Sequence, residues 1–217
     1  MGAIARTAAN NITTSGVFTS GAITNSSVTG ITVLANASDG ITFISSQTAS
    51  ASASISFTTG LDSTYKAYKF VFSNIHPATD GASLQFNMST DGGSNYNVTK
   101  TTTYFYAFND EGGTNSTALS YVASSDLAQS TAFQEIIREI GNDNDQSGNG
   151  SLTLFNPSST TYVKHFITRN NTSQNGDYQE ELNIAGYGNT TSAVNAVRFQ
   201  MSAGNIDAGT IYMYGIK

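Results

Sequence analysis

An alternating pattern runs through Tyr65-Lys66-Ala67-Tyr68-Lys69-Phe70-Val71-Phe72, where Tyr68, Phe70 and Phe72 occupy every second position. Side chains two residues apart lie on the same face of a β-strand. The three rings would therefore line one face, with Lys69 and Val71 on the other. This spacing predicts a strand that presents an aromatic face to a core.

The same period of two recurs along the chain, in Leu84–Ser89, Val197–Ser202 and Ile211–Tyr214. Further strands are expected near 49–58, 100–108, 116–123, 151–155, 162–169 and 180–187. Turn signals separate the strands, namely Asp80-Gly81, Asp91-Gly92-Gly93, Glu111-Gly112-Gly113, Asn149-Gly150 and Asn175-Gly176. Many short strands with such turns predict an all-β fold, a jelly-roll-like antiparallel β-sandwich.

The segment from Phe133 to Ile140 is compatible with two structures. Phe133, Ile136, Ile137 and Ile140 have the spacing of a two-turn helix. Glu135–Ile140 can equally be a strand that does not alternate strictly. The β pattern of the neighbouring sequence favours the strand.

The composition is polar but poor in charge. Serine, threonine and asparagine make up more than a third of the 217 residues, and only 11% are charged, against roughly 25% in ordinary domains. Such residues suit the outer faces and turns of sheets. Few acids or bases remain for catalysis, so the composition favours a β-built surface or assembly protein.

Charge and hydropathy also limit the partners. The net charge is −6 and the nine Lys and Arg residues are scattered, whereas nucleic-acid binding calls for clustered positive charge. There is no cysteine, which excludes disulfides and thiolate metal sites. No apolar run has membrane length, and the N-terminus lacks the apolar middle of a secretory signal. We therefore expect neither nucleic-acid binding nor membrane insertion.

The amino-acid composition of the chain changes near residue 50. Residues 1–48 are predicted to be an extended N-terminal attachment and oligomerisation segment, and residues 49–217 a β-sandwich tip domain. Units of five residues, beginning with Thr14–Phe18 and Thr19–Ile23, place one or two apolar residues after small polar ones. Parallel copies wound together could bury such a pattern; alternatively, a Ser/Thr/Gly-rich tail produces it by chance. The expected assembly contacts are Ile12, Val17, Phe18, Ile23, Val28, Ile31 and Val33.

No catalytic constellation is visible. Neither His76 nor His165 has a nucleophile arrangement nearby in the sequence. Glu180 and Glu181 are adjacent, so on a strand they would point to opposite faces and could not act as a pair. We predict no catalytic residue, no cofactor and no metal ligand.

The strongest candidate for a metal-binding site is the segment 142–149. From Asp143 it places oxygen-bearing side chains at the first, third and fifth positions and glycine at the sixth, as in a calcium loop. The twelfth position, which should hold a bidentate glutamate, is Leu154. A polar turn is therefore favoured over a calcium site.

Recognition of a partner could use the tyrosines, because tyrosine is rigid and amphipathic. We single out Tyr178 and Tyr187 with the neighbouring Asn175 and Asp177. The alternative is that these tyrosines line the core or a subunit interface.

Two segments, residues 61–96 and 202–217, carry a resemblance to a known family. The first runs from Leu61-Asp62-Ser63-Thr64-Tyr65 to Ser94-Asn95-Tyr96, and the second ends in Gly209-Thr210-Ile211-Tyr212-Met213-Tyr214-Gly215-Ile216-Lys217. With them, residues 50–217 resemble the C-terminal β-domain of bacteriophage virion proteins, particularly appendage and fibre-like proteins of tailed phages of marine bacteria. The resemblance implies a multimeric, β-rich tip joined to the particle by an N-terminal segment, and it supplies no catalytic residues.

The resulting expectation is a non-enzymatic structural protein on the outer surface of a virion. It would form a homotrimer, attach to other virion proteins through its N-terminal segment, and adhere to host-surface glycans. Two alternatives stay open: a capsid decoration protein without a receptor role, and a polysaccharide depolymerase.

Overall fold

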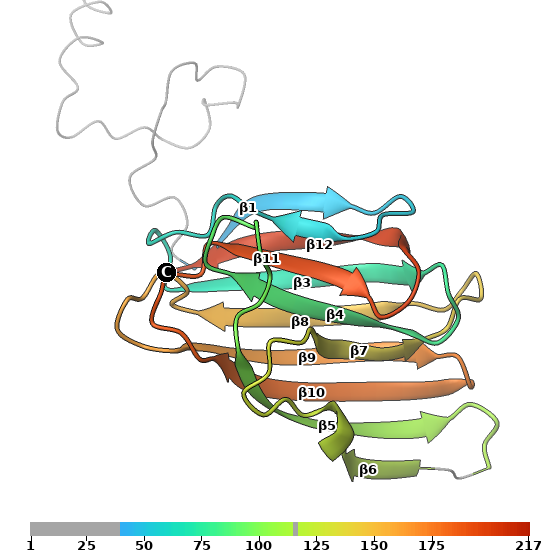
Figure 1. Cartoon of the computed structure of the whole chain (residues 1–217). Coiled ribbons are helices and arrows are strands. Elements are labelled where there is room, and N and C mark those ends of the chain that lie inside the picture. Colours follow the sequence, from blue (N-terminus) through green and yellow to red (C-terminus); the bar gives the residue numbers. More distant parts are fainter. Residues whose placement is uncertain (1–39, 115–116) are drawn as a thin grey trace, which may run out of the picture. The chain divides into compact units, whose positions relative to one another are not determined.

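A computed structural model describes residues 40–114 and 117–217, and apart from one short 3-10 helix the regular elements of this part of the chain are all strands (Figure 1). Its elements are β1 (Ile41–Thr48), β2 (Ile55–Phe57), β3 (Ala67–Pro77), β4 (Ala82–Ser89), β5 (Lys100–Asp110), β6 (Thr117–Tyr121), the 3-10 helix η1 (Ala123–Ser125), β7 (Gln134–Ile140), β8 (Gly148–Phe155), β9 (Lys164–Gln174), β10 (Tyr178–Gly188), β11 (Ala196–Met201) and β12 (Ile206–Ile216).

The strands form two antiparallel layers. The larger sheet has the order β1-β12-β3-β8-β9-β10-β5-β6, and the smaller has the order β7-β4-β11-β2. A single residue pair, Ile140 with Gln174, links β7 to β9 and joins the two layers along one side. The predicted all-β sandwich is confirmed.

The connectivity is that of a jelly roll with two insertions. Strands β1, β12, β3 and β8 face β2, β11, β4 and β7, and the chain passes between these two sets in the order expected for two Greek keys. The hairpins β5–β6 and β9–β10 are inserted after β4 and after β8, and they extend the larger sheet beyond the smaller one (Figure 1).

The core lies between the layers and centres on Phe199 of β11. Its ring makes aromatic contacts with Phe57, Phe70, Phe72 and Phe86, at centroid distances of 5.2 to 6.5 Å. Phe70 and Phe72 come from the alternating segment that predicted the strand, and both are buried. The Phe199 ring meets those of Phe57, Phe70 and Phe72 edge-on, and its contacts with Phe70 and Phe72 span the space between the sheets.

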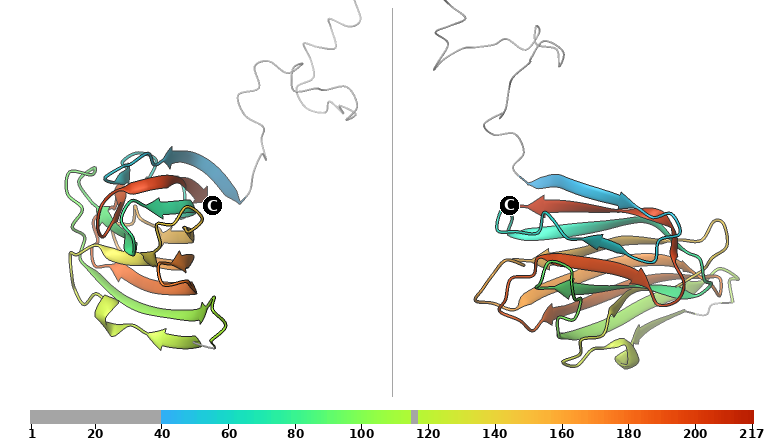
Figure 2. Two further views of the ribbon diagram at one scale, coloured as in Figure 1. Left: turned by 90° about the vertical axis from the view of Figure 1, so that its right-hand side faces the viewer. Right: turned by 45° about the horizontal axis from the view of Figure 1, so that its top comes forward.

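The inserted strand β5 is bordered by a further segment. Residues 122–130 run along the edge of β5 that β6 leaves free, where Thr102 donates its N–H to the Leu127 carbonyl at 2.9 Å. The Thr102 hydroxyl donates to Gln134 Oε1 of β7 at 2.6 Å. Figure 2 shows this connection and η1 beside β5 and β6. Tyr104, in the middle of β5, is fully buried.

The folded part begins earlier than expected. Residues 41–48 pair with β12 from Ile41↔Ile216 to Thr48↔Thr210, so the boundary expected between residues 48 and 49 is corrected: β1 belongs to the sandwich. Ser/Thr-rich edge strands need few large apolar residues, which is why composition alone placed this strand in the N-terminal segment. The expected assembly contacts from Ile12 to Val33 lie outside the described residues.

The segment 134–140 is strand β7, as favoured, and the helical alternative is wrong. Ile136, Ile137 and Ile140 are all buried because β7 is irregular: its register with β4 shifts twice, and Glu139 has a φ of 44°. A bulge places two consecutive side chains toward the core and so mimics helical spacing.

Asn149-Gly150 is not a turn, contrary to expectation. Both residues lie within β8, where Gly150 has a φ of 144° and passes close to β9; a Cβ on Gly150 would lie 2.6 Å from the Arg169 carbonyl oxygen. The expected strand near 49–58 is also reduced to the three residues of β2.

Candidate functional site

The outer face of the larger sheet, which points away from the core, brings distant residues into rows. Antiparallel pairing aligns Ser151 of β8 with Arg169 of β9, Asn183 of β10 and Phe105 of β5. The next row contains Thr153, Ile167, Ala185 and Thr103. Cross-strand neighbours of this kind are close enough to act on one ligand.

Three adjoining hollows follow these rows and form what we call the outer groove. The middle hollow, of about 520 Å³, shares Arg169 with one neighbour and Ile167 and Ala185 with the other. The groove runs along β9 from Asn171 to His165, a distance of about 20 Å at the usual rise of a strand. Its outward-facing lining residues are Lys69, Thr101, Thr103, Phe105, Asn149, Ser151, Thr153, His165, Ile167, Arg169, Asn171, Glu181, Asn183, Ala185 and Tyr187.

The middle of the groove combines small and apolar side chains. Ser151, Thr153 and Ala185 are short and leave room above the sheet. Ile167 is 52% exposed and Phe105 is 44% exposed. Large apolar side chains that remain this accessible at the centre of a sheet offer a contact surface to a ligand.

One end of the groove is aromatic. The His165 and Tyr187 rings are cross-strand neighbours, with centroids 5.9 Å apart and planes inclined by 54°. Each ring has an apolar body and a polar atom, so each can pack against a ligand and hydrogen-bond to it.

The other end is charged. Arg169 Nε donates to Glu181 Oε1 at 2.6 Å, and the side chains are 76% and 40% exposed. This hydrogen bond holds the pKa of Glu181 below its usual value. An exposed ion pair contributes little to folding, so both partners keep donors and acceptors available to a ligand. Asn171 and Asn183 flank the pair.

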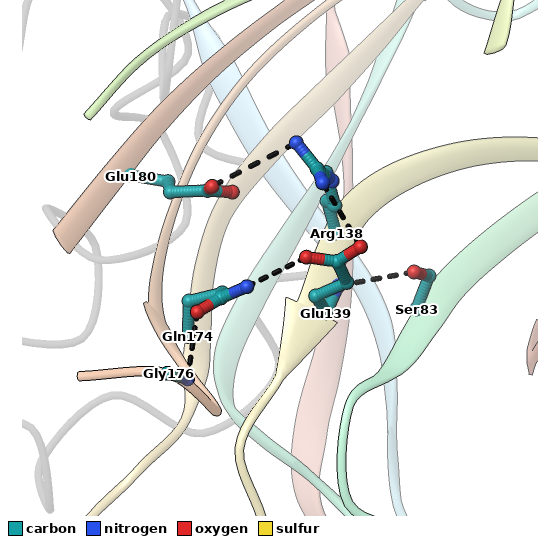
Figure 3. Close-up of polar contacts among 6 residues, drawn as sticks. All are labelled: Ser83, Arg138, Glu139, Gln174, Gly176 and Glu180. Atoms are coloured by element: carbon teal, nitrogen blue, oxygen red, sulfur yellow. Dashed lines mark hydrogen bonds and ion pairs between the residues drawn. The ribbon is translucent and has the colours of Figure 1, made fainter. Parts of the chain in front are cut away.

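The β9–β10 hairpin that carries this end is fixed to β7 by a polar cluster (Figure 3). Gln174 donates from Nε2 to Glu139 Oε2 at 2.6 Å and accepts the Gly176 N–H at 2.7 Å. The Glu139 N–H donates to Ser83 Oγ at 3.0 Å. These bonds pair the polar groups of Glu139 in the irregular part of β7 and connect the β9–β10 hairpin to that strand.

Behind the groove lies an acid of a different kind. Glu180 is only 4% exposed, and its Oε2 has no hydrogen-bond partner in the described part of the chain. Arg138 Nη1 lies 3.9 Å from the other carboxylate oxygen, Oε1 (Figure 3). Burial nevertheless raises the pKa of Glu180 to about 7. Glu180 and Glu181 thus lie on opposite faces, as expected.

The four residues singled out for recognition do not form one site. Tyr187 lines the outer groove, but Tyr178 points to the other face of β10 and packs against Phe108, with centroids 5.4 Å apart. Tyr178 and Tyr187 are nine residues apart, about 30 Å along the strand. Asn175 and Asp177 are exposed in the β9–β10 turn. The expected cluster is corrected because Tyr178 and Tyr187 lie on opposite faces of β10 and near its two ends.

Sequence reasoning missed Phe105, Ile167, Arg169 and Asn183. A signal existed for Ile167, because Phe166 and Ile167 are both apolar and one of them must face outward in a strand. Arg169 and Glu181 come together only through strand register.

The segment 142–149 is the connection from β7 into β8. Gln146 is buried and accepts the Asp143 N–H, and Leu154, at the position of the missing calcium ligand, is in the core. A nearby cleft contains His76, whose Nδ1 lies 3.8 Å from Asp207 Oδ2. In residues 40–114 and 117–217, no three His, Cys, Asp or Glu residues are placed to hold a metal ion.

No protein-family model, curated protein or solved structure matches this chain. Among the residues that the structure describes, no helix is long and apolar enough to cross a membrane. A jelly roll hosts many functions, so the fold alone does not define one for this protein.

Proposed function

We propose that this protein is a non-enzymatic adhesion module that binds a glycan chain of a host surface in the outer groove. The observation that carries the proposal is the groove itself, which combines exposed apolar side chains with a dense set of hydrogen-bonding groups on a rigid sheet.

A sugar chain matches this surface chemically. A pyranose ring has a face of C–H groups and an edge of hydroxyl groups. Phe105, Ile167 and Tyr187 can pack against the former, while Arg169, Asn171 and Asn183 can hydrogen-bond to the latter. The open, elongated shape suits a polymer better than a small ligand.

The small number of acidic residues in the groove favours binding without cleavage. Glycosidic hydrolysis requires two carboxyl groups about 5 to 9.5 Å apart. Of the lining residues of the described groove, Glu181 is the single carboxylate, and it is engaged with Arg169. Glu180, its neighbour, is buried on the opposite face.

The biological setting that we propose is the outer surface of a tailed-phage virion, as a fibre or appendage protein present in several copies. It is supported by the resemblance of residues 61–96 and 202–217 to phage virion proteins. Several copies joined through their N-terminal segments would bind a cell by avidity even if each groove bound weakly.

The test is binding of the full chain to purified bacterial surface polysaccharides arrayed on a surface. We expect Tyr187→Ala and Arg169→Ala each to weaken binding at least tenfold. Tyr162→Ala, which removes a tyrosine that is 70% exposed and outside the groove, should bind like the wild type. Circular dichroism would verify that all variants are folded.

Unchanged binding by both groove variants would refute the proposed site. Failure of the folded wild-type protein to bind any polysaccharide would favour a decoration role instead. Release of new reducing ends from a bound polysaccharide would show a depolymerase.

A further inference from the structure

An exposed apolar patch lies at the β1 end of the larger sheet. It shares no residue with the outer groove but adjoins it, because Tyr214 pairs with Lys69, which lines the groove. Ile41 is 58% exposed and Phe43 is 56% exposed. Phe43 pairs with Tyr214 of β12, with ring centroids 5.7 Å apart, and Tyr212 follows Tyr214 at 6.5 Å. We call Ile41, Phe43, Tyr212 and Tyr214 the β1 patch.

The strand that carries the patch lacks the usual protection of a sheet edge. In the described part of the chain β1 pairs only with β12, and across its other side the Gln47 side chain donates to the Ser56 carbonyl at 2.6 Å. Edge strands of monomers are commonly protected by charges or proline. Ile41-Thr42-Phe43-Ile44-Ser45-Ser46-Gln47-Thr48 contains neither.

The position of the patch in the chain indicates what covers it. Gly40 immediately precedes β1, and its carbonyl accepts the Lys217 N–H at 3.3 Å. The 39 residues before Gly40, which contain the expected assembly contacts, therefore lead directly into the patch. If these segments from several copies associate, the first strands of those copies are brought close together.

The opposite end of the sheet provides a comparison. Leu119 and Tyr121 of β6 are 76% and 60% exposed and also lie on the outer face, in register with Ala107 and Phe105. They are at the far edge of the sheet from β1 (Figure 1), whereas Gly40 and Lys217, at the ends of the described residues, adjoin each other beside β1.

We propose that the β1 patch is a subunit contact, covered by a second copy of this chain. This inference rests on the multimeric display proposed above and adds that the sandwich itself, besides residues 1–39, contributes to the interface. Apolar side chains without charge suit a contact that must form between molecules of net charge −6.

Sedimentation velocity of the full chain over a range of concentrations tests the contact. We expect the wild type to be an oligomer and the double variant Ile41→Ser/Phe43→Ser to raise its dissociation constant at least tenfold. The matched control Leu119→Ser/Tyr121→Ser removes comparable exposed apolar groups at the other edge and should assemble like the wild type.

Cysteine cross-linking provides a second readout that does not depend on affinity. The chain has no cysteine, so a chain with one introduced cysteine can be cross-linked only to another copy by a short bismaleimide. Ser46→Cys, on the outer face of β1 opposite Tyr212, should cross-link efficiently. Ser124→Cys, exposed in η1, should not.

The outcomes separate this inference from the proposed function. A monomeric wild type at all concentrations would overturn both the multimeric display and the patch contact. An oligomer that is insensitive to Ile41→Ser/Phe43→Ser and not cross-linked at Ser46→Cys would overturn the patch contact alone. In that case the N-terminal segment of the same chain or another partner would be the occupant.

Discussion

Glu180 and Glu181 are consecutive residues with opposite environments. The Glu181 carboxylate is on the outer face, exposed and paired with Arg169, whereas Glu180 is buried behind the groove. The difference follows from the alternation of a strand and from the hairpin's position over β7. Opposite shifts in pKa result: downward for Glu181, because the Arg169 hydrogen bond favours the charged form, and upward for Glu180, because burial disfavours it.

The buried acid predicts a pH dependence of stability. In the folded protein the pKa of Glu180 is about 7, whereas the usual pKa of a glutamate is 4.5. The stabilisation from this group is therefore complete below pH 4.5 and lost as the pH rises through 7. Arg138 opposes the shift, whereas Glu135 and Glu139 support it. We expect the loss to reach up to about 3 kcal/mol.

Urea unfolding of the wild type and Glu180→Gln between pH 4.5 and pH 8 measures this effect. The stability of the wild type relative to the variant should fall across the interval, because glutamine does not titrate. Lys100, whose pKa burial lowers to about 7, affects stability above pH 7 in both proteins and cancels in the difference. A constant difference between the two proteins would contradict the prediction, and Glu181→Gln is the exposed control.

At the scale of elements, the close approach of β12 to β3 depends on an irregular part of β12. Strand β12 departs from its register with β3 on both sides of Ala208. Gly209 has a φ of 111°, and a Cβ there would lie 2.5 Å from the Asn74 carbonyl oxygen and 2.8 Å from Ile75 Cα. Only glycine therefore allows β12 to pass this close to β3 while its carbonyl accepts the Ala49 N–H.

Gly209→Ala should lower the free energy of unfolding by more than about 2 kcal/mol, because it adds a backbone clash to an unfavourable φ. Gly92→Ala is the matched control: Gly92 has a φ of 73°, but nothing lies within 4 Å of its added Cβ. We expect it to cost about 1 kcal/mol. Equal losses in chemical denaturation would show that the close approach to β3 is unimportant.

At the scale of the whole molecule, Phe199 of the smaller sheet packs across the core against Phe70 and Phe72 of the larger sheet, and it also contacts Phe57 and Phe86 of its own sheet. This residue is fully buried, and its ring has neighbours from β2, β3 and β4. Removing it would leave a cavity that the rigid sheets cannot close.

Phe199→Ala should therefore lower the free energy of unfolding by about 3 to 5 kcal/mol. Thermal unfolding followed by circular dichroism gives the measurement. Leu119→Ala, at a 76% exposed position of β6, should leave the midpoint nearly unchanged. A comparable shift in both variants would mean that the sandwich does not depend on this contact.

The sequence by itself determined the fold class and most of the strands. The period of two in 65–72 and the glycine-containing turns are local features, and the side chains that they predicted to be buried, such as Phe70 and Phe72, are buried. Local features are visible in sequence because alternation and turn chemistry involve residues only a few positions apart.

Only the tertiary structure decided where β1 belongs, how the two hairpins extend the larger sheet, and which side chains share the outer groove. The row Ser151, Arg169, Asn183 and Phe105 joins four strands and depends on the register of each pairing. A shift of one residue in any pair would turn that strand's side chains to the other face. Register is set by long-range packing of the whole sandwich, so no short segment of the sequence contains it.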